Sequence, residues 1–236
     1  MPASTGSEIY KKTLQSIGWV NARTAKGIGE GTGTLVDKER RLFLTAYHVI
    51  AGAPEGEIYF PRYDKDGRAI NDPKHYLKNE RPVIGEIVAV DMKRDLAILR
   101  LQSLPASVFE LPLAAKGVEI ADRVYTVGKP AVSSALWVYT EGSVRQVVFR
   151  KFRLNTKQDM EAWIAEAQFP INPGDSGGPV VNDRSEIVGV NCSRKDLNVA
   201  SLMSNFIELR EIQVVLEQAR RYPMTPAPFK GFDKGP

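Results

Sequence analysis

The most informative stretch of the sequence is PGDSGGPV, which runs from Pro173 to Val180. Three glycines surround Ser176, and the apolar pair Val180–Val181 closes the stretch. The spacing Gly-x-Ser-x-Gly also occurs at the nucleophile elbow of α/β-hydrolases, which needs a helix after the serine and a histidine later in the chain. Here an apolar segment follows the serine, and both histidines, His48 and His75, precede it. The stretch therefore indicates a serine in a loop that leads into a strand.

A serine hydroxyl is a weak nucleophile, so it needs a neutral imidazole to take its proton. The imidazole in turn needs a carboxylate that fixes its tautomer and stabilises its cation. The oxyanion that forms needs backbone N–H donors, and glycines let the main chain turn these groups toward one point. The expected donors in this sequence are the N–H groups of Gly174 and Ser176.

His48 is the expected general base for Ser176. It follows the apolar strand expected at Leu42–Thr45, where a lone histidine is more often a core residue bound to a backbone carbonyl. The chain has only two histidines, however, and His75 lies in the polar segment 61–80, which is expected to be an exposed loop. Because Ser176 needs one of the two, the composition favours His48.

Asp95 is the expected partner of His48. It opens the apolar strand expected at Asp95–Leu101, where a buried carboxylate is costly unless it has a partner. Asp91 and Asp37 are the alternatives. Asp91 ends the preceding strand and is expected to be solvated, and Asp37 lies in a charged turn where a solvated role suffices.

Short segments rich in β-branched and aromatic residues, bounded by Gly, Pro or charged turns, cover most of the chain and predict strands. They fall into two sets separated by the proline-containing connector 103–113, so we expect two barrel-like halves at about 17–104 and about 113–203. The expected strands are Ile17–Arg23, Gly33–Val36, Leu42–Thr45, Ile58–Phe60, Pro82–Val90 and Asp95–Leu101, then Arg123–Val127, Leu136–Glu141, Ser143–Val148, Ala165–Phe169, Val180–Val181, Ile187–Asn191 and Ala200–Met203.

Two helices are expected. One is short, at 7–15. The other spans about 205–221, with Asn205 as its N-cap and Glu208 reaching back from the third helical position. The proline-containing segment 223–236 is expected to be a tail or linker.

The composition excludes several classes of protein. With 236 residues, 43% hydrophobic and 25% charged, the chain is an ordinary globular one. No apolar run reaches the roughly 18 residues of a membrane-spanning helix. The first residues lack an apolar targeting segment, so we expect a cytoplasmic protein, or an exported one if the sequence is trimmed. Cys192 is the only cysteine, which rules out an intramolecular disulfide and, with two histidines, a structural zinc site of the usual kind.

No metal or cofactor is therefore expected, and the segment Asp64–Gly67 is interpreted as a turn because its surroundings lack the spacing of a calcium loop. The net charge of +4 is too small to indicate a membrane or nucleic-acid partner. Four basic residues alternate with apolar ones in VRQVVFRKFR, where a solvated strand face is expected and nucleic-acid binding is the alternative. These residues are Arg145, Arg150, Lys151 and Arg153.

Taken together, these motifs resemble the trypsin-like serine proteases, in particular the bacterial HtrA/Deg type, over about residues 15–218. The resemblance implies two six-stranded antiparallel β-barrels, with His48 as general base, Asp95 as its orienter and Ser176 as nucleophile in the cleft between them. The motifs that carry it are Gly31–Val36, Leu44–Ile50, Asp95–Leu99, Ile171–Pro179 and Gly189–Cys192.

The resemblance also implies where a substrate binds. Pro170 lies at the base of the specificity pocket and Ile171 in its wall, which favours aliphatic side chains. Arg194 or Lys195 would favour acidic ones if its side chain turned into the cleft. The strand expected to pair with the substrate backbone contains Asn191, Cys192, Ser193 and Arg194.

The resulting functional expectation is a serine endopeptidase domain at 1–222 that acts on protein or peptide substrates through an acyl-enzyme. The alternative is a protease-like binding or scaffold module that is inactive or activated only by a partner. A fused or associated regulatory domain is a further expected partner. Digestive relatives pair a newly freed amino terminus with the aspartate before the serine. The start of this chain does not resemble such a terminus, so Asp175 must find another partner or the loop Phe169–Asp175 switches between ordered and disordered forms.

Overall fold

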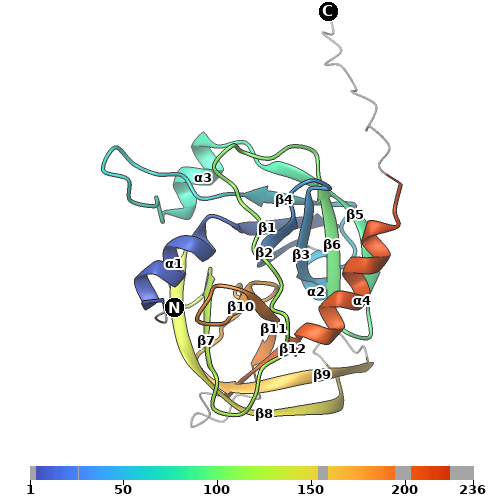
Figure 1. Ribbon diagram of the computed structural model, residues 1–236. Coiled ribbons are helices and arrows are strands. Elements are labelled where there is room, and N and C mark those ends of the chain that lie inside the picture. The colour runs from blue at the N-terminus through green and yellow to red at the C-terminus, as the bar shows by residue number, and fades with distance from the viewer. Residues whose placement is uncertain (1–3, 26, 154–158, 195–202, 224–236) are drawn as a thin grey trace, which may run out of the picture.

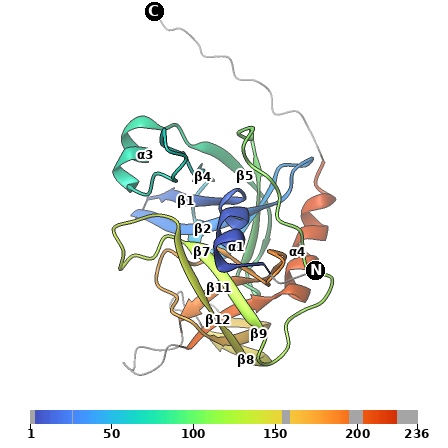
Figure 2. The same ribbon diagram turned by 60° about the vertical axis from the view of Figure 1, so that its left-hand side comes forward.

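The fold consists of two closed, six-stranded antiparallel β-barrels, as the sequence predicts (Figure 1). The structure is a computed structural model, and it describes residues 4–25, 27–153, 159–194 and 203–223, without the side chains of residues 152, 153, 193 and 194. Figure 2 shows the two barrels one above the other, with the N-terminal helix and the C-terminal helix packed outside them.

The first barrel has the strand order β1-β2-β3-β6-β5-β4. Its interior is a cluster of fully buried apolar side chains that includes Leu35, Phe43, Ile58 and Leu99. Burial of such side chains is the main term that stabilises the barrel. The strands are β1 Ile17–Thr24, β2 Gly27–Asp37, β3 Leu42–Ala46, β4 Glu55–Tyr59, β5 Val83–Asp91 and β6 Leu96–Leu101.

The second barrel has the order β10-β11-β12-β9-β8-β7. The two strands expected at Leu136–Glu141 and Ser143–Val148 are one continuous strand, β8, so that prediction is wrong. Gly142 does not interrupt the strand because it pairs with Val124 of β7. The strands are β7 Arg123–Gly128, β8 Val138–Arg153, β9 Asp159–Gln168, β10 Pro179–Val181, β11 Ile187–Arg194 and β12 Met203–Glu208.

The two barrels share one buried apolar cluster. It joins Leu44 and Ile98 of the first barrel to Ile164 and Val190 of the second. Helices α1 (Gly6–Leu14) and α4 (Leu209–Arg220) add side chains to the same cluster from outside, including Ile9. The relative position of the barrels is therefore fixed by a common core, and residues from both can form one site.

The C-terminal helix starts later than expected. α4 begins at Leu209, so the predicted start at 205 with Asn205 as N-cap is wrong. Residues 203–208 instead form β12, which pairs with both β9 and β11 and closes the second barrel. Pairing on both sides satisfies the backbone groups of these residues, and the helix cap is Glu208, whose carboxylate accepts from the Arg210 N–H at 3.0 Å.

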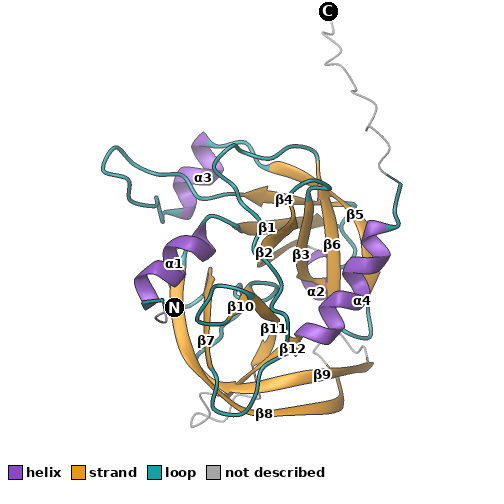
Figure 3. Ribbon diagram, viewed as in Figure 1, coloured by secondary structure: helices purple, strands orange, loops and turns teal. Residues whose placement is uncertain are grey.

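Two further helices were not expected, α2 (Tyr47–Ile50) and α3 (Pro73–Asn79), both visible in Figure 3. α3 lies in the segment 61–80, where an exposed loop was predicted. Asp72 caps it by accepting from the Lys74 N–H at 2.9 Å. The helix forms because Tyr76 is fully buried in an aromatic cluster.

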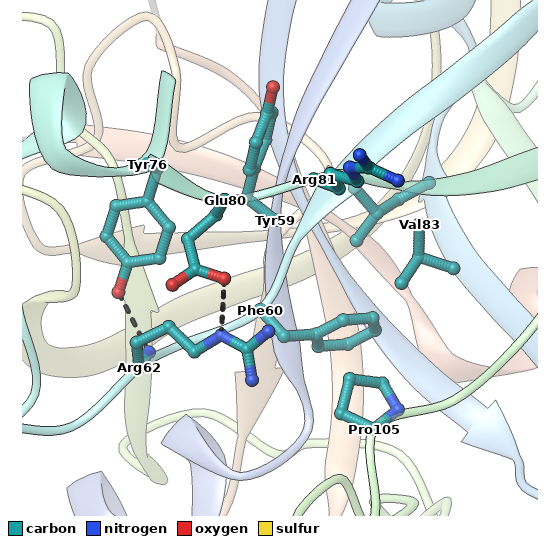
Figure 4. A pocket seen from close by; sticks show the side chains of 9 residues that line it. Tyr59, Phe60, Arg62, Tyr76, Glu80, Arg81, Val83 and Pro105 are labelled. Carbon is teal, nitrogen blue, oxygen red and sulfur yellow. Dashed lines mark hydrogen bonds and ion pairs between the residues drawn. The ribbon is translucent and has the colours of Figure 1, made fainter. Parts of the chain in front are cut away.

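The Tyr76 hydroxyl accepts from the backbone N–H of Arg62 at 2.9 Å, and Arg62 forms an ion pair with Glu80. Figure 4 shows Arg62 joined to both of these residues, beside a small pocket. The turn expected at Asp64–Gly67 is confirmed, since the Gly67 N–H donates to the Asp64 carbonyl at 3.0 Å.

Glu208→Ala should lower the free energy of unfolding by about 1–2 kcal/mol, because it removes the acceptor for the first turn of α4. Glu208→Gln keeps an oxygen that can accept from the Arg210 N–H, so it should cost less. Chemical denaturation of the three proteins measures the difference. An unchanged stability in Glu208→Ala would show that α4 is not capped there.

Candidate active site

His48 and Asp95 form a closely bonded pair in the structure. β3 ends at Ala46, and the short helix α2 then places His48 over the start of β6. The Asp95 carboxylate accepts from the His48 backbone N–H at 2.8 Å and bonds to its ring Nδ1 at 2.6 Å. Asp95 is only 2% exposed. Because a carboxylate only accepts, Nδ1 carries the proton and Nε2 is left as the basic nitrogen.

The alternative carboxylates have other partners. Asp91 accepts from the Arg94 guanidinium at 2.7 Å. Asp37 accepts from the Arg40 N–H at 2.9 Å and forms an ion pair with Arg220. His75 also lies elsewhere, on α3, where its ring contacts Asn79 and Glu80. The structure therefore brings Asp95, and neither alternative, to the ring of His48.

Ser176 lies between the two barrels. Its carbonyl accepts from the Thr32 N–H of β2 at 2.8 Å, and the next residue, Gly177, donates to the Asn191 carbonyl of β11 at 2.8 Å. The Ser176 hydroxyl donates to the Cys192 carbonyl at 3.4 Å. Among the described residues, no hydrogen bond joins this hydroxyl to His48.

The main chain before Ser176 presents unused donors. The Pro173 carbonyl accepts from the Ala131 N–H at 2.7 Å, so the Gly174 N–H on the same trans peptide points away from Ala131. Gly174 has a φ of +95°, and a Cβ there would lie 2.1 Å from the Lys129 carbonyl oxygen, so only glycine fits. Within the described chain, neither the Gly174 N–H nor the Ser176 N–H has an acceptor. Both can serve an oxyanion.

Asp175 has a hydrogen-bond donor within its own loop. Its carboxylate accepts from the Asn172 N–H at 2.9 Å, and its Oδ1 lies close against Gly128. Burial raises the pKa of Asp175 to about 7, although the Asn172 hydrogen bond and the charge of Lys129 act in the opposite direction. The Lys129 ammonium itself is bonded to Glu30 at 2.7 Å. The expected need for a replacement partner is met by a backbone amide.

Two of the residues expected to bind substrate have buried side chains. Ile171 is 3% exposed and packs in the core of the second barrel, and its N–H donates to the Ser204 hydroxyl. Asn191 is fully buried. Its backbone bonds to Gly177 and Gly178, and its side-chain amide donates to Thr126 at 2.8 Å. Both side chains therefore belong to the interior of the barrel, and the expected roles of Ile171 and Asn191 in substrate binding stay predictions.

Cys192 lies at an irregularity in the pairing of β11 with β12, between Asn191 and Ser193. Its carbonyl faces Ser176, and its thiol donates to Asp95 Oδ2 at 3.4 Å. The backbones of Ser193 and Arg194 pair with β12. Their side chains, and Lys195, lie outside the described residues.

Sequence reasoning missed four contacts of the site. They are the bonds of Thr32 to Ser176 and to Gly174, the bond of Ala131 to Pro173, and the thiol contact of Cys192 with Asp95. Thr32 lies within the recognised segment Gly31–Val36, which was a usable signal. The Ala131 contact is made by a backbone amide, so no residue type could indicate it.

Over the described residues, no cluster of three or more His, Cys, Asp or Glu side chains is arranged to hold a metal ion. In that same part of the chain, no helix is long and apolar enough to cross a membrane. The basic residues of β8 face β9: Arg145 bonds to Gln168, Arg150 to Glu166 and Lys151 to Glu161. The side chain of Arg153 is not among those that the structure describes.

Asp175→Asn should change how stability depends on pH. In the folded protein Asp175 stays protonated up to about pH 7, whereas its usual pKa is 3.8. The folded state therefore binds more protons between these values, and its stability falls as the pH rises through that window. The shift corresponds to at most about 4 kcal/mol, so at pH 8 the Asn variant should be the more stable protein, with a smaller difference near pH 4.

Denaturant unfolding of both proteins from pH 4 to pH 8 measures this difference. Parallel stability curves would show that Asp175 is already ionised in the folded state.

Comparison with known proteins identifies related sequences and folds. Residues 31–190 match the trypsin-like peptidase domain. The HtrA-like serine protease of Staphylococcus aureus strain bovine RF122 / ET3-1 is 26% identical over 158 residues, which are 65% of this chain and 20% of the relative. The HtrA-like serine protease of strain MRSA252 is 26% identical over 159 residues, which are 66% of this chain and 20% of the relative. The chain thus spans about a fifth of the length of these curated relatives.

Two solved structures share the fold. The active form of the Rv3671c protease from M. tuberculosis superposes with a TM-score of 0.73 at 18% identity, over 89% of this chain and 83% of that one. The HtrA-type protease AlgW with a tripeptide gives a TM-score of 0.68 at 20% identity, over 90% and 62%. Since the match at 31–190 includes His48, Asp95 and Ser176 and spans more than half of the sequence, this chain belongs to the family of trypsin-like peptidase domains.

Proposed function

We propose that this chain is a serine endopeptidase, with Ser176 as nucleophile, His48 as general base and Asp95 as the group that orients His48. One observation carries the proposal. The buried carboxylate of Asp95 binds both the backbone N–H and the ring Nδ1 of His48, which leaves Nε2 as the base. In a serine protease triad, a buried carboxylate bonded to Nδ1 holds the imidazole in this tautomer and orientation.

The chemistry follows from that arrangement. Ser176 Oγ rotates from the Cys192 carbonyl toward His48 Nε2, transfers its proton there and attacks the carbonyl carbon of the peptide. The N–H groups of Gly174 and Ser176 stabilise the oxyanion. The His48 imidazolium then protonates the leaving amine, and an acyl-enzyme remains. A water molecule gives a proton to His48 and attacks the carbonyl carbon of the ester. The His48 imidazolium then returns that proton to Ser176 Oγ as the ester bond breaks, which restores the serine hydroxyl and releases the acid product.

We propose that the substrate backbone binds beside β11. β10 pairs with β11 only as far as Val190, and Asn191 is taken by Gly177 and Gly178. An extended peptide can add there as a further strand. This supports protein or peptide substrates.

For the residue before the scissile bond, we propose a small aliphatic side chain. Pro170 supplies no carboxylate to pair with Lys or Arg. An acidic preference through Arg194 is the alternative, and cleavage of a peptide library by the wild type and by Arg194→Ala separates the two.

The position of the Ser176 hydroxyl favours one second candidate. Because it bonds to Cys192 and not to His48, the chain also fits a module that cleaves only after a partner or substrate reorders the site. Labelling with a fluorophosphonate distinguishes them. Labelling of Ser176 in the isolated chain supports the constitutive enzyme, and labelling only with an added peptide supports the activated one.

Substitution of the three residues tests the enzyme. Ser176→Ala and His48→Ala should each abolish hydrolysis of an unstructured protein substrate, and the double variant should lose no more than either one. Asp95→Asn should reduce turnover by about 10⁴-fold, because it favours the wrong tautomer of His48. Full turnover in Asp95→Asn would show that another carboxylate orients His48. Cleavage by Ser176→Ala would show that Ser176 is not the nucleophile.

A further inference from the structure

The turn that presents Asp95 has an unusual backbone. It connects β5 to β6, and its last residue, Asp95, has a φ of +56°. Residues other than glycine seldom adopt this left-handed conformation, and they keep it only where the surrounding structure holds them there. Some contact must therefore fix the turn.

Arg94, the residue directly before Asp95, makes that contact. Its N–H donates to Asp91 Oδ1 at 3.1 Å, and its guanidinium Nη1 donates to Asp91 Oδ2 at 2.7 Å. Its Nε donates to Glu211 Oε2, which comes from α4. One guanidinium thus joins the start of the turn to a helix more than one hundred residues later, and its planar fork fits two carboxylates at once.

Glu211 is an unusual residue for the inner face of a surface helix, since it is only 5% exposed. Its second oxygen accepts from the Trp163 N–H of β9 at 2.8 Å. The same strand reaches the turn directly, because the Glu161 N–H donates to the Lys93 carbonyl at 2.9 Å. The turn is therefore held from three sides, by β5, by β9 and by α4.

The other side of Asp95 is held as well. Its carbonyl accepts from the Tyr47 N–H at 3.0 Å, just before His48. With Arg94 fixed on one side and the carbonyl on the other, the two backbone rotations of Asp95 have little freedom. Those rotations set the direction of the Asp95 Cα–Cβ bond, from which the carboxylate reaches the backbone N–H and the ring of His48.

We propose that Arg94 and Glu211 are positioning residues, which hold the turn so that the Asp95 carboxylate meets both the backbone N–H and the ring of His48. The effect of these residues on catalysis rests on the proposed function. Their effect on the geometry of Asp95 and His48 does not. The competing interpretation is that this ion pair only fastens α4 to the barrels, in which case its loss would lower stability and leave His48 unchanged.

The variants Arg94→Lys and Glu211→Gln test the proposal. Lysine keeps the charge but loses the fork, and glutamine keeps the shape but loses the charge. Lys93→Ala and Glu217→Gln are the matched controls, since they remove exposed ion pairs from the same turn and the same helix. Thermal unfolding of all four proteins identifies any variant that is not folded under the assay conditions.

The first readout is turnover. Arg94→Lys and Glu211→Gln should each lower kcat by about 10- to 100-fold at nearly unchanged KM, as expected for a small misplacement of a group that acts on the transition state. The controls should retain wild-type turnover. In an Asp95→Asn background, Arg94→Lys should cost almost nothing more, because its effect passes through the Asp95 carboxylate. An equal loss in both backgrounds would overturn the proposal.

The second readout needs no catalysis. In Ser176→Ala protein, the His48 Nδ1 proton should give a low-field NMR signal because its bond to Asp95 is short and charge-assisted. Arg94→Lys and Glu211→Gln should weaken or shift that signal, and the controls should not. An unchanged signal in both variants overturns the positioning role. A shifted signal in a chain that never hydrolyses peptides upholds it and refutes the proposed function instead.

Discussion

The buried carboxylate of Asp95 is the constraint on which the rest of the site depends. A charge at this depth is unfavourable unless hydrogen bonds surround it. Two donors come from His48 and one from the thiol of Cys192, so groups from both barrels meet at one carboxylate. Moving either barrel away from the Asp95 carboxylate would break some of these hydrogen bonds. The orientation of the His48 imidazole therefore depends on the relative position of the two barrels.

The loop that carries Ser176 is likewise held by hydrogen bonds from both barrels. Thr32 of β2 bonds to the carbonyls of Ser176 and Gly174, and β11 accepts from Gly177. Gly177 has a φ of +84°, and a Cβ there would lie 2.3 Å from the Thr32 carbonyl oxygen. The glycines thus allow the loop to lie directly against the first barrel. Within this loop, the Ser176 hydroxyl donates to the Cys192 carbonyl of β11 at 3.4 Å.

Much of this arrangement could be predicted from local sequence, because strands and glycine-rich loops leave local patterns. The two sets of strands belong to that part. The closed six-stranded barrels were implied by the resemblance to trypsin-like proteases, and the pairing of His48 with Asp95 was inferred from the chemistry that a serine nucleophile needs. The helix at Pro73–Asn79 was missed although Asp72 and Pro73 are ordinary start signals, since its stability comes from burial of Tyr76 against residues far along the chain. Asn205 looked like a cap because the pairing that makes residues 203–208 a strand is equally remote. Contacts such as Arg94 with Glu211 leave no local pattern at all.

The most direct test of the account is the structure of a covalent complex with a peptide boronate, which mimics the tetrahedral intermediate. The account predicts a bond from boron to Ser176 Oγ, and one boronate oxygen within hydrogen-bond distance of the Gly174 and Ser176 N–H groups. It also predicts that His48 keeps its bond to Asp95. An adduct on another residue, or a boronate oxygen that meets neither N–H, would contradict it.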